Sequence, residues 1–312
     1  MRQHTPTIRR SRLIMPVNQP KFVDKAYLRN ADAIVLDLED SVPDNQKEMA
    51  RTQVKDAIRA VKKGGSAVFV RVNPTSDHIE KDLRASIWPG LDGIVLPKLE
   101  TKEQLQAVEQ HITEIEHARG LPAQHIAVSA IVETVAGLTA LPHSLEESQR
   151  LDSITLGAED FSLDSGIELG EETESALTYA RLQILFSAKQ LNILPLGIMG
   201  SIATLADNDQ YASYVRLAYK HGFVGSTCIH PSHVEVLNKG FSPSQEEVER
   251  AKSLIHTFEH AEKQGKASTT FEGKMIDIPH YKKALALLER HRAIEAFETE
   301  KAAARRKGES TS

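Results

Sequence analysis

The sequence contains one cysteine, one tryptophan and no long apolar stretch. The single thiol, Cys228, cannot form a disulfide within the chain, which is typical of a protein in a reducing cytoplasm. No run of 18 apolar residues occurs, and no apolar signal region follows the basic N-terminus, so neither a membrane span nor a secretory signal is expected. These absences predict a cytoplasmic protein with no membrane partner.

The chain also lacks an excess of basic residues. Lysine and arginine total 38 against 43 acidic residues, a net charge of -5, which argues against a nucleic-acid partner. Neither a P-loop nor a G-x-G-x-x-G motif is present, so the common nucleotide-binding fingerprints are absent. The 312 residues are enough for one large α/β barrel with a tail, or for two domains.

Eight apolar runs of strand length alternate with helical segments. Runs that are apolar throughout are typical of a parallel sheet covered by helices. Eight such strands predict an α/β fold, a (β/α)₈ TIM barrel over residues 1–240, with a C-terminal helical extension over 241–312. The predicted strands are 13–17, 33–40, 67–74, 93–98, 130–134, 154–160, 193–199 and 225–231.

Capping residues, prolines and polar spacing predict the helices. In the barrel we expect helices over 21–29, 44–62, 78–87, 101–117, 174–190 and 207–220. In the extension, Ser244 and Glu247 form a capping box for a helix to about residue 260. A loop or extended segment is expected over 265–279 and a helix over 280–305, with disorder from Arg306 onward.

Ionisable residues follow most of the predicted strands, at the rim where barrels keep their chemistry. Glu133 and Asp160 can share a hard divalent cation such as Mg²⁺, or they can be merely solvated acids. Arg71 suits a substrate carboxylate, because its planar fork binds one in bidentate fashion, or it forms a structural ion pair with Glu39 or Asp40. The full set is Asp37, Glu39, Asp40, Arg71, Lys98, Glu133, Glu159, Asp160 and His230.

Several of these residues lie in longer motifs that occur in a characteristic order. The chain from about residue 10 to 283 resembles the citrate lyase β-subunit-like family of the HpcH/HpaI aldolase superfamily, which includes malyl-CoA and citramalyl-CoA lyases. The segments that carry the resemblance are 31–42 (ADAIVLDLEDSV), 70–73 (VRVN), 90–98 (GLDGIVLPK), 132–134 (VET), 156–160 (LGAED), 229–232 (IHPS) and 241–244 (FSPS).

The resemblance implies a TIM barrel whose C-terminal segment reaches an adjacent subunit, in trimers or hexamers. It implies Mg²⁺, or alternatively Mn²⁺, held by Glu133 and Asp160, and a substrate whose oxygen atoms are bound by Arg71, with Glu133 as a further substrate-binding residue. The segment 273–277 resembles the family's C-terminal motif, whose aspartate, here Asp277, is donated across the interface as an acid/base. The supporting residues at the rim are Asp37, Glu39, Asp40 and Lys98.

The activity that this implies is reversible carbon–carbon cleavage of a 3-hydroxy-3-carboxyacyl-CoA thioester, such as citramalyl-CoA, malyl-CoA or citryl-CoA, into an oxo acid and an acyl-CoA. The chain departs from the family pattern at strand seven, which lacks the usual acids, so that Met199 could line the wall instead. It departs again at Ser226, where lysine is usual. Three alternatives stay open: a CoA-independent metal-dependent pyruvate-type aldolase, a thioester hydrolase and a non-catalytic subunit.

Overall fold

The computed structural model describes residues 7–201 and 208–310. These residues fall into two compact units. The larger unit contains residues 9–241 and 304–310, and the smaller contains residues 7–8 and 242–303.

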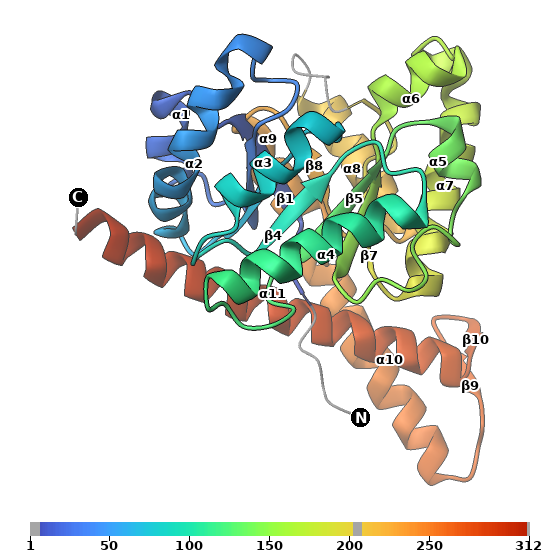
Figure 1. Cartoon of the computed structure of the whole chain (residues 1–312). Helices are drawn as coiled ribbons and strands as arrows, with labels where there is room; N and C mark the ends of the chain where they lie inside the picture. The colour runs from blue at the N-terminus through green and yellow to red at the C-terminus, as the bar shows by residue number, and fades with distance from the viewer. Residues whose placement is uncertain (1–6, 202–207, 311–312) are drawn as a thin grey trace. The chain divides into compact units, whose positions relative to one another are not determined.

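Parallel strands form the central sheet of the larger unit, and the helices lie outside them (Figure 1). The order of the strands in the sheet is β7-β6-β5-β4-β3-β2-β1-β8. A parallel bridge between Leu196 and Gly225 brings the two end strands together, so the sheet closes into a barrel. The strands are β1 (Ser11–Pro16), β2 (Ala33–Asp37), β3 (Ala67–Arg71), β4 (Gly93–Leu96), β5 (Ala127–Val132), β6 (Leu151–Leu156), β7 (Leu194–Leu196) and β8 (Ser226–Cys228).

Alternate residues of the strands face two different apolar regions, because successive side chains of a strand point to opposite faces. Ile34 and Leu36 of β2 belong to the large core between the sheet and its helices. Val35, together with Phe69 and Val95, belongs to a small separate cluster inside the barrel. The uninterrupted apolar runs in the sequence therefore serve both faces, as the prediction of a covered parallel sheet requires.

Helices follow the strands around the outside of the larger unit (Figure 1). The predicted helices are confirmed to within a few residues, and position 207 of the helix predicted over 207–220 lies outside the described residues. The helices are α1 (Pro20–Ala26), α2 (Lys47–Lys62), α3 (Ser76–Ser86), α4 (Lys102–Ala118), α5 (Val135–Thr139), α6 (Ala158–Ser165), α7 (Glu174–Leu191), α8 (Asn208–His221) and α9 (Ser232–Gly240), with 3₁₀ turns η1 (Asp44–Gln46) and η2 (Glu171–Thr173).

Three of these helices, α5, α6 and α9, were not predicted, because each has fewer than ten residues, too few for a helical period to stand out in the sequence. Helix α6 corrects the sequence interpretation most. The predicted strand 154–160 ends at Leu156, and Glu159 and Asp160 belong to the first turn of α6. An acid in the first helical turn is favoured, because the helix dipole is positive there.

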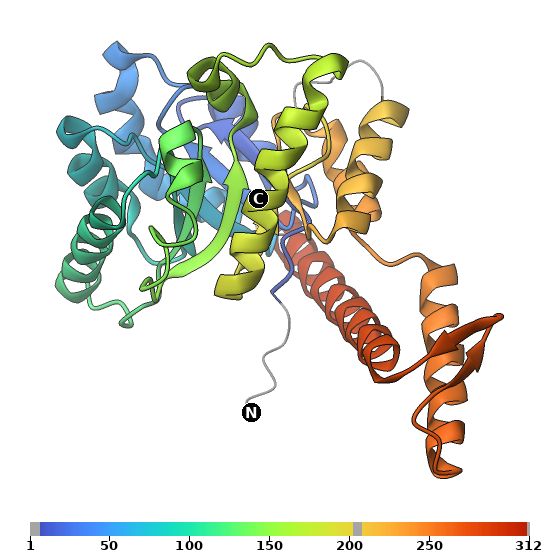
Figure 2. The ribbon, with the colours of Figure 1, turned by 90° about the vertical axis from the view of Figure 1, so that its right-hand side faces the viewer.

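The smaller unit consists of α10 (Gln245–Lys263), the hairpin of β9 (Thr269–Phe271) and β10 (Lys274–Ile276), and most of α11 (Ile278–Ser310). The predicted capping box of Ser244 and Glu247 is confirmed. The hairpin lies beside α10 (Figure 2), and Phe258 of α10 stacks on Tyr281 of α11 with ring centroids 5.1 Å apart. The expected disorder from Arg306 is wrong, because α11 continues to Ser310.

The last turns of α11 belong to the larger unit, where Arg305 Nη1 donates to Asn30 Oδ1 at 2.6 Å. None of the helices that the structure describes is long and apolar enough to cross a membrane.

A buried ion pair connects the start of β1 with the residue before β2. Arg10 Nε and Nη2 donate to the two Asp32 carboxylate oxygens, each at 2.9 Å, and the side chains are 3% and 0% exposed. Removing one partner leaves an uncompensated buried charge, so we expect Asp32→Ala to lower the free energy of unfolding by ~3–5 kcal/mol. Urea denaturation measures this loss.

The matched control for this prediction is Asp56→Ala. Asp56 pairs with Arg59 at 3.4 Å, but these side chains are 83% and 66% exposed. Exposed pairs contribute little because water and salt screen them. Equal losses in the two variants would contradict the assignment of Arg10 and Asp32 as a structural pair.

Candidate active site

A cavity of about 260 Å³ lies within the barrel and opens at the carboxyl ends of the strands. Apolar side chains such as Val35, Val95 and Ile131 form its inner wall. Its ionisable side chains gather at the rim and come from several different strands and helices, as in barrel enzymes. The charged and hydroxyl side chains that line it are Arg12, Asp40, Arg71, Glu133, Thr155, Glu159, Asp160, Arg181, Ser226 and Thr227.

Arg71, the last residue of β3, is held by Asp37 at the end of β2. Its Nε and Nη2 donate to the two oxygens of Asp37, each at 2.7 Å, in the bidentate geometry that a guanidinium and a carboxylate favour. Its Nη1 lies 3.1 Å from Asp40 Oδ2 and 2.9 Å from Glu39 Oε2. The predicted ion pairs with Glu39 and Asp40 are therefore confirmed, but Asp37 is the principal partner.

The contact between Asp37 and Arg71 stabilises the charged form of both side chains, and it shifts both pKa values accordingly. Burial opposes ionisation of Asp37, but the hydrogen bonds from Arg71 and Ser41 outweigh it and lower the Asp37 pKa. Burial likewise opposes the charge on Arg71, but the bonds to Asp37 outweigh it and raise the Arg71 pKa. The guanidinium is thus a fixed cation at the cavity wall.

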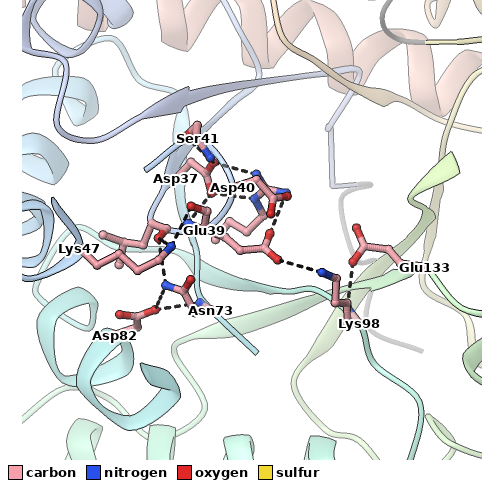
Figure 3. Close-up of polar contacts among 11 residues, drawn as sticks. Asp37, Glu39, Asp40, Ser41, Lys47, Asn73, Asp82, Lys98 and Glu133 are labelled. Carbon is pink, nitrogen blue, oxygen red and sulfur yellow. Dashed lines mark hydrogen bonds and ion pairs between the residues drawn. The ribbon is translucent and has the colours of Figure 1, made fainter. Parts of the chain in front are cut away.

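The loop after β2 holds a second buried acid, Glu39, whose side chain is 6% exposed. Lys47 Nζ donates to the carbonyl oxygens of Leu38 and Glu39, at 3.1 and 3.0 Å, and so fixes the loop (Figure 3). Burial raises the Glu39 pKa to about 8. The attraction to Arg71 lowers this pKa, and repulsion from Asp40 and Glu133 offsets part of that lowering. Glu39 is therefore a poorly stabilised carboxylate close to the cavity.

Glu133 follows β5 directly and is buried. Lys98 N–H donates to Glu133 Oε2 at 3.1 Å (Figure 3), and Lys98 adopts a left-handed backbone with φ of 52°. Such a conformation costs a non-glycine residue of order 1 kcal/mol, and it is common at functional sites. Burial raises the Glu133 pKa to about 7, and repulsion from Asp160 contributes, so the two carboxylates lie close enough to interact.

Gly157, between β6 and α6, makes room for the Glu133 carboxylate. A Cβ at position 157 would lie 2.5 Å from both Cγ and Oε1 of Glu133. Only glycine can therefore occupy this position while Glu133 keeps its place. The G-A-E-D segment thus positions one acid through Gly157 and supplies another, Asp160.

Asp160 lines the cavity and is half-buried. Within residues 7–201 and 208–310, its carboxylate accepts no hydrogen bond and forms no ion pair. Its neighbour Glu159 is exposed and accepts a hydrogen bond from Ser201 Oγ at 3.2 Å. Asp160 is therefore the acid of this segment that is free to bind a cation.

The donor set at the rim fits a hard divalent cation. Glu133 and Asp160 offer only oxygen, repel one another, and line one cavity, so a positive ion between them would relieve the repulsion. The described residues contain no group of three or more His, Cys, Asp or Glu side chains arranged to hold a metal. Water or substrate oxygens would have to complete the coordination, as is usual for Mg²⁺.

The other predicted site residues differ in whether they line the cavity. Asp40 lines the cavity, whereas Asp37, Glu39 and Lys98 surround the lining residues and hold them. His230 is exposed, and its Nδ1 is bonded to Ser232 Oγ rather than lining the cavity. Asp277 lies in the smaller unit, between β10 and α11, where its Oδ1 lies 2.5 Å from His280 Nδ1.

Strand seven requires one correction. Met199 does not line the cavity and belongs to the core instead. The side chains that strand seven and its loop contribute to the wall are those of Leu196 and Ile198.

Sequence analysis missed Arg181 of α7, which lines the cavity and is 4% exposed. It forms an ion pair with Glu174, and its Nη2 donates to Gly200 O at 3.0 Å. The available signal was an arginine among buried apolar residues of a helix, beside Ala180 and Ile184. Arg181 was not predicted as a site residue because it lies within a helix and not at the end of a strand.

The fold and this cavity define a (β/α)₈-barrel enzyme, and two family models extend the assignment. The model described as HpcH/HpaI aldolase/citrate lyase matches residues 10–231. A model described as C-C bond lyase of the TIM-barrel fold matches residues 186–294. The chain belongs to the HpcH/HpaI aldolase/citrate lyase family and is a carbon–carbon lyase.

Curated relatives agree with this assignment. The chain is 31% identical over 273 residues to citrate lyase subunit beta of Leuconostoc mesenteroides subsp. cremoris, covering 87% of this chain and 89% of the relative. It is 28% identical over 307 residues to L-malyl-CoA/beta-methylmalyl-CoA lyase of Cereibacter sphaeroides, covering 92% and 96%.

A crystal structure of CitE from Mycobacterium tuberculosis, in complex with magnesium, acetoacetate and coenzyme A, superposes with a TM-score of 0.71. It has 25% identity to this chain, and the match covers 90% of this chain and 97% of CitE.

We predict that Gly157→Ala displaces the Glu133 carboxylate and weakens binding of a divalent cation by about tenfold or more, a loss of roughly 1.4 kcal/mol. Calorimetric titration with Mn²⁺ measures the affinity. The fold should persist, because the clash is with the flexible end of a side chain. Gly170→Ala is the control, since no atom of the described part of the chain lies within 4 Å of a Cβ at that position. Unchanged affinity in Gly157→Ala would remove Glu133 from the ligand set.

Proposed function

We propose that the protein is a Mg²⁺-dependent lyase that cleaves or forms a carbon–carbon bond in a 3-hydroxy-3-carboxyacyl-CoA thioester. The observation that carries the proposal is the meeting of Glu133, Asp160 and Arg71 in one cavity at the barrel rim. Two acids and a fixed guanidinium can bind a divalent cation and an anionic substrate together. The named substrates of the relatives, malyl-CoA and citrate, favour a carboxylate-bearing substrate.

Glu133 and Asp160 would hold the metal, consistent with the magnesium in the related CitE structure. The bound Mg²⁺ would supply Lewis acidity toward the hydroxyl and carboxylate oxygens of the substrate. Glu133 keeps its orientation through Lys98 N–H, and Gly157 leaves the space that its carboxylate needs. An alternative cation with the same ligand preference is Mn²⁺.

Arg71 would bind the substrate oxygens and stabilise negative charge as the bond breaks. Its Nε and Nη2 are occupied by Asp37, so Nη1, directed toward Asp40 and Glu39, is the nitrogen available for exchange with a substrate oxygen. The bidentate pair prevents reorientation of the guanidinium during the reaction. Arg181 is a second cation in the same cavity.

The bond that breaks joins the hydroxyl-bearing carbon to the carbon next to the thioester carbonyl. The hydroxyl loses its proton as the oxo acid forms, and the electron pair of the broken bond passes to the thioester enolate. That enolate takes up one proton to give the acyl-CoA. An acid/base is therefore needed at the cavity, and Asp277 is our candidate.

We propose that Asp277 acts in the cavity of a neighbouring subunit, in a trimer or hexamer. The segment around it exposes apolar side chains, since Met275 is 68% and Ile278 49% exposed. Large exposed apolar side chains on either side of one acid favour a surface that a partner covers. Covering would also exclude water from the reaction.

Two other activities use the same cavity. A CoA-independent pyruvate-type aldolase would need no site for the thioester's nucleotide, and a thioester hydrolase would need a positioned water. The coenzyme A in the related CitE structure favours the thioester lyase over the aldolase. The apolar strand-seven wall, with Leu196 and Ile198, favours a substrate with apolar bulk near the reacting carbons.

We predict that Glu133→Ala and Asp160→Ala each lower kcat/KM at least about a hundredfold, because each removes one of two protein ligands and so costs roughly 3 kcal/mol or more of transition-state stabilisation. The fold should persist, since both side chains lie at the rim. Activity is assayed against Mg²⁺ concentration with malyl-CoA and citramalyl-CoA. Glu159→Ala, which removes the exposed neighbouring acid, should retain most activity. A reaction that proceeds without any divalent ion would refute the metal assignment.

The second prediction tests the shared site. A chain with Asp277→Ala and a chain with Glu133→Ala should each be inactive alone and should regain part of the activity when mixed, because some cavities would combine an intact Glu133 with an intact Asp277. Subunit exchange is followed with differently labelled chains. An active monomer in dilute solution, or inactive mixtures after demonstrated exchange, would exclude donation of Asp277 between subunits.

A further inference from the structure

A second cavity, of about 370 Å³, lies on the outside of the larger unit. Lys55 and Arg59 of α2 form one side, and Arg119, which caps α4, forms another. Trp88 and Pro89, which follow α3, complete the lining. Helices α2, α3 and α4 follow one another around the barrel (Figure 1). Helix α3 ends at Ser86, and the loop that follows it carries Trp88 into the space between α2 and the end of α4.

This cavity belongs to the opposite end of the barrel from the active site. Trp88 and Pro89 lie a few residues before β4 begins, and Arg119 ends the helix that returns to the start of β5. Glu133, in contrast, follows the carboxyl end of β5. The two cavities share no lining residue, so a ligand of the second cavity is distinct from the substrate of the first.

Of the described residues, three cations and no acid line the second cavity. Within the part of the chain that the structure describes, neither Lys55 nor Arg119 has an acidic partner. Arg59 has Asp56 at 3.4 Å, an exposed pair that contributes little charge compensation. Like charges gathered around one cavity repel one another, and an anion would relieve that repulsion.

Two of the cations are held in place around the indole. The Lys55 ammonium lies 4.0 Å and the Arg119 guanidinium 3.6 Å from the Trp88 ring centroid, within the range of cation–π attraction. Arg119 also donates to Arg84 O at 2.6 Å and to Ile87 O, and Trp88 Nε1 donates to Ala85 O at 2.8 Å. Burial, and secondarily repulsion from Arg84, lowers the Arg119 pKa. The contacts with the indole and with the two carbonyl oxygens hold the Lys55 and Arg119 side chains in position before any ligand arrives.

We propose that this cavity binds a polyphosphate group, with inorganic diphosphate as its simplest form. Arginine and lysine together are the side chains that proteins use for phosphate, arginine as a fork and lysine as a compact charge. Three cations match the multiple charge of two linked phosphates better than a single carboxylate. Because cations already lie over the indole, binding depends on charge rather than on stacking of an aromatic ring.

Trp88 is the one tryptophan of the sequence, so intrinsic tryptophan fluorescence reports on this cavity alone. The full-length protein is titrated with inorganic diphosphate in a buffer that contains EDTA, which keeps divalent metal from bridging the ligand to the active site. We expect a saturable fluorescence change that weakens as NaCl is added, because salt screens exposed charges over roughly 8–10 Å. Isothermal calorimetry on the same samples gives the Kd independently of the fluorophore.

The test variant is Lys55→Gln with Arg59→Gln, which removes two charges and leaves Trp88 and Arg119 in place. Its Kd for diphosphate should rise about tenfold or more, or roughly 1.4 kcal/mol. The matched control is Lys21→Gln with Lys25→Gln, which removes two exposed charges from α1, one of them a lysine that lies 4.9 Å from the Phe22 ring centroid. The control should bind as the unchanged protein does, and circular dichroism checks that both variants fold.

Three outcomes would overturn the proposal. One is the absence of a saturable fluorescence change at millimolar diphosphate. Another is an equal effect of the two double variants, which would indicate non-specific attraction to surface charge. The last is calorimetric binding without a response of Trp88, which would place the anion elsewhere. In each case Lys55 and Arg119 would serve only to cover the indole.

Discussion

The ion pair between Asp37 and Arg71 is the interaction on which the rest of the rim depends. It links the last residues of β2 and β3, which are themselves partners in the sheet. Each charge is buried enough that it would be unfavourable alone, and the bidentate contact makes both favourable. The same guanidinium then attracts Asp40 and Glu39, so one pair organises the acidic loop and one wall of the cavity.

Glu39 and Glu133 differ from Asp37, because their surroundings disfavour the charged form of the carboxyl group. Burial raises the pKa of Glu39 and of Glu133, and neighbouring carboxylates raise both further. Proteins tolerate such like-charge groups where a cation or a proton is part of the function. Arg71 is therefore a permanent positive charge at this rim, whereas the surroundings of Glu133 and Asp160 favour an additional, exchangeable cation.

Much of the fold could be predicted from the sequence, because apolar runs such as Ile34 to Leu36 report burial directly. Residues that line the cavity could be predicted where an ionisable side chain ends or follows an apolar strand, as at Arg71 and Glu133. Asp160 was assigned to a strand, since α6 is too short to show a period. Arg181 was missed, because which face of α7 meets the cavity depends on packing that no local pattern encodes.

The closure of the barrel is uneven. Among the described residues, seven neighbouring pairs of strands share ladders of three to five residue pairs. In contrast, β7 meets the residue before β8 through the single bridge of Leu196 and Gly225. Pro195 has no N–H to give to a ladder. The wall formed by Leu196 and Ile198 is thus the part of the barrel least bound by main-chain pairing. Changes of side chain there disturb few backbone bonds, so the shape of this wall can change at little cost to the barrel that carries Glu133 and Asp160.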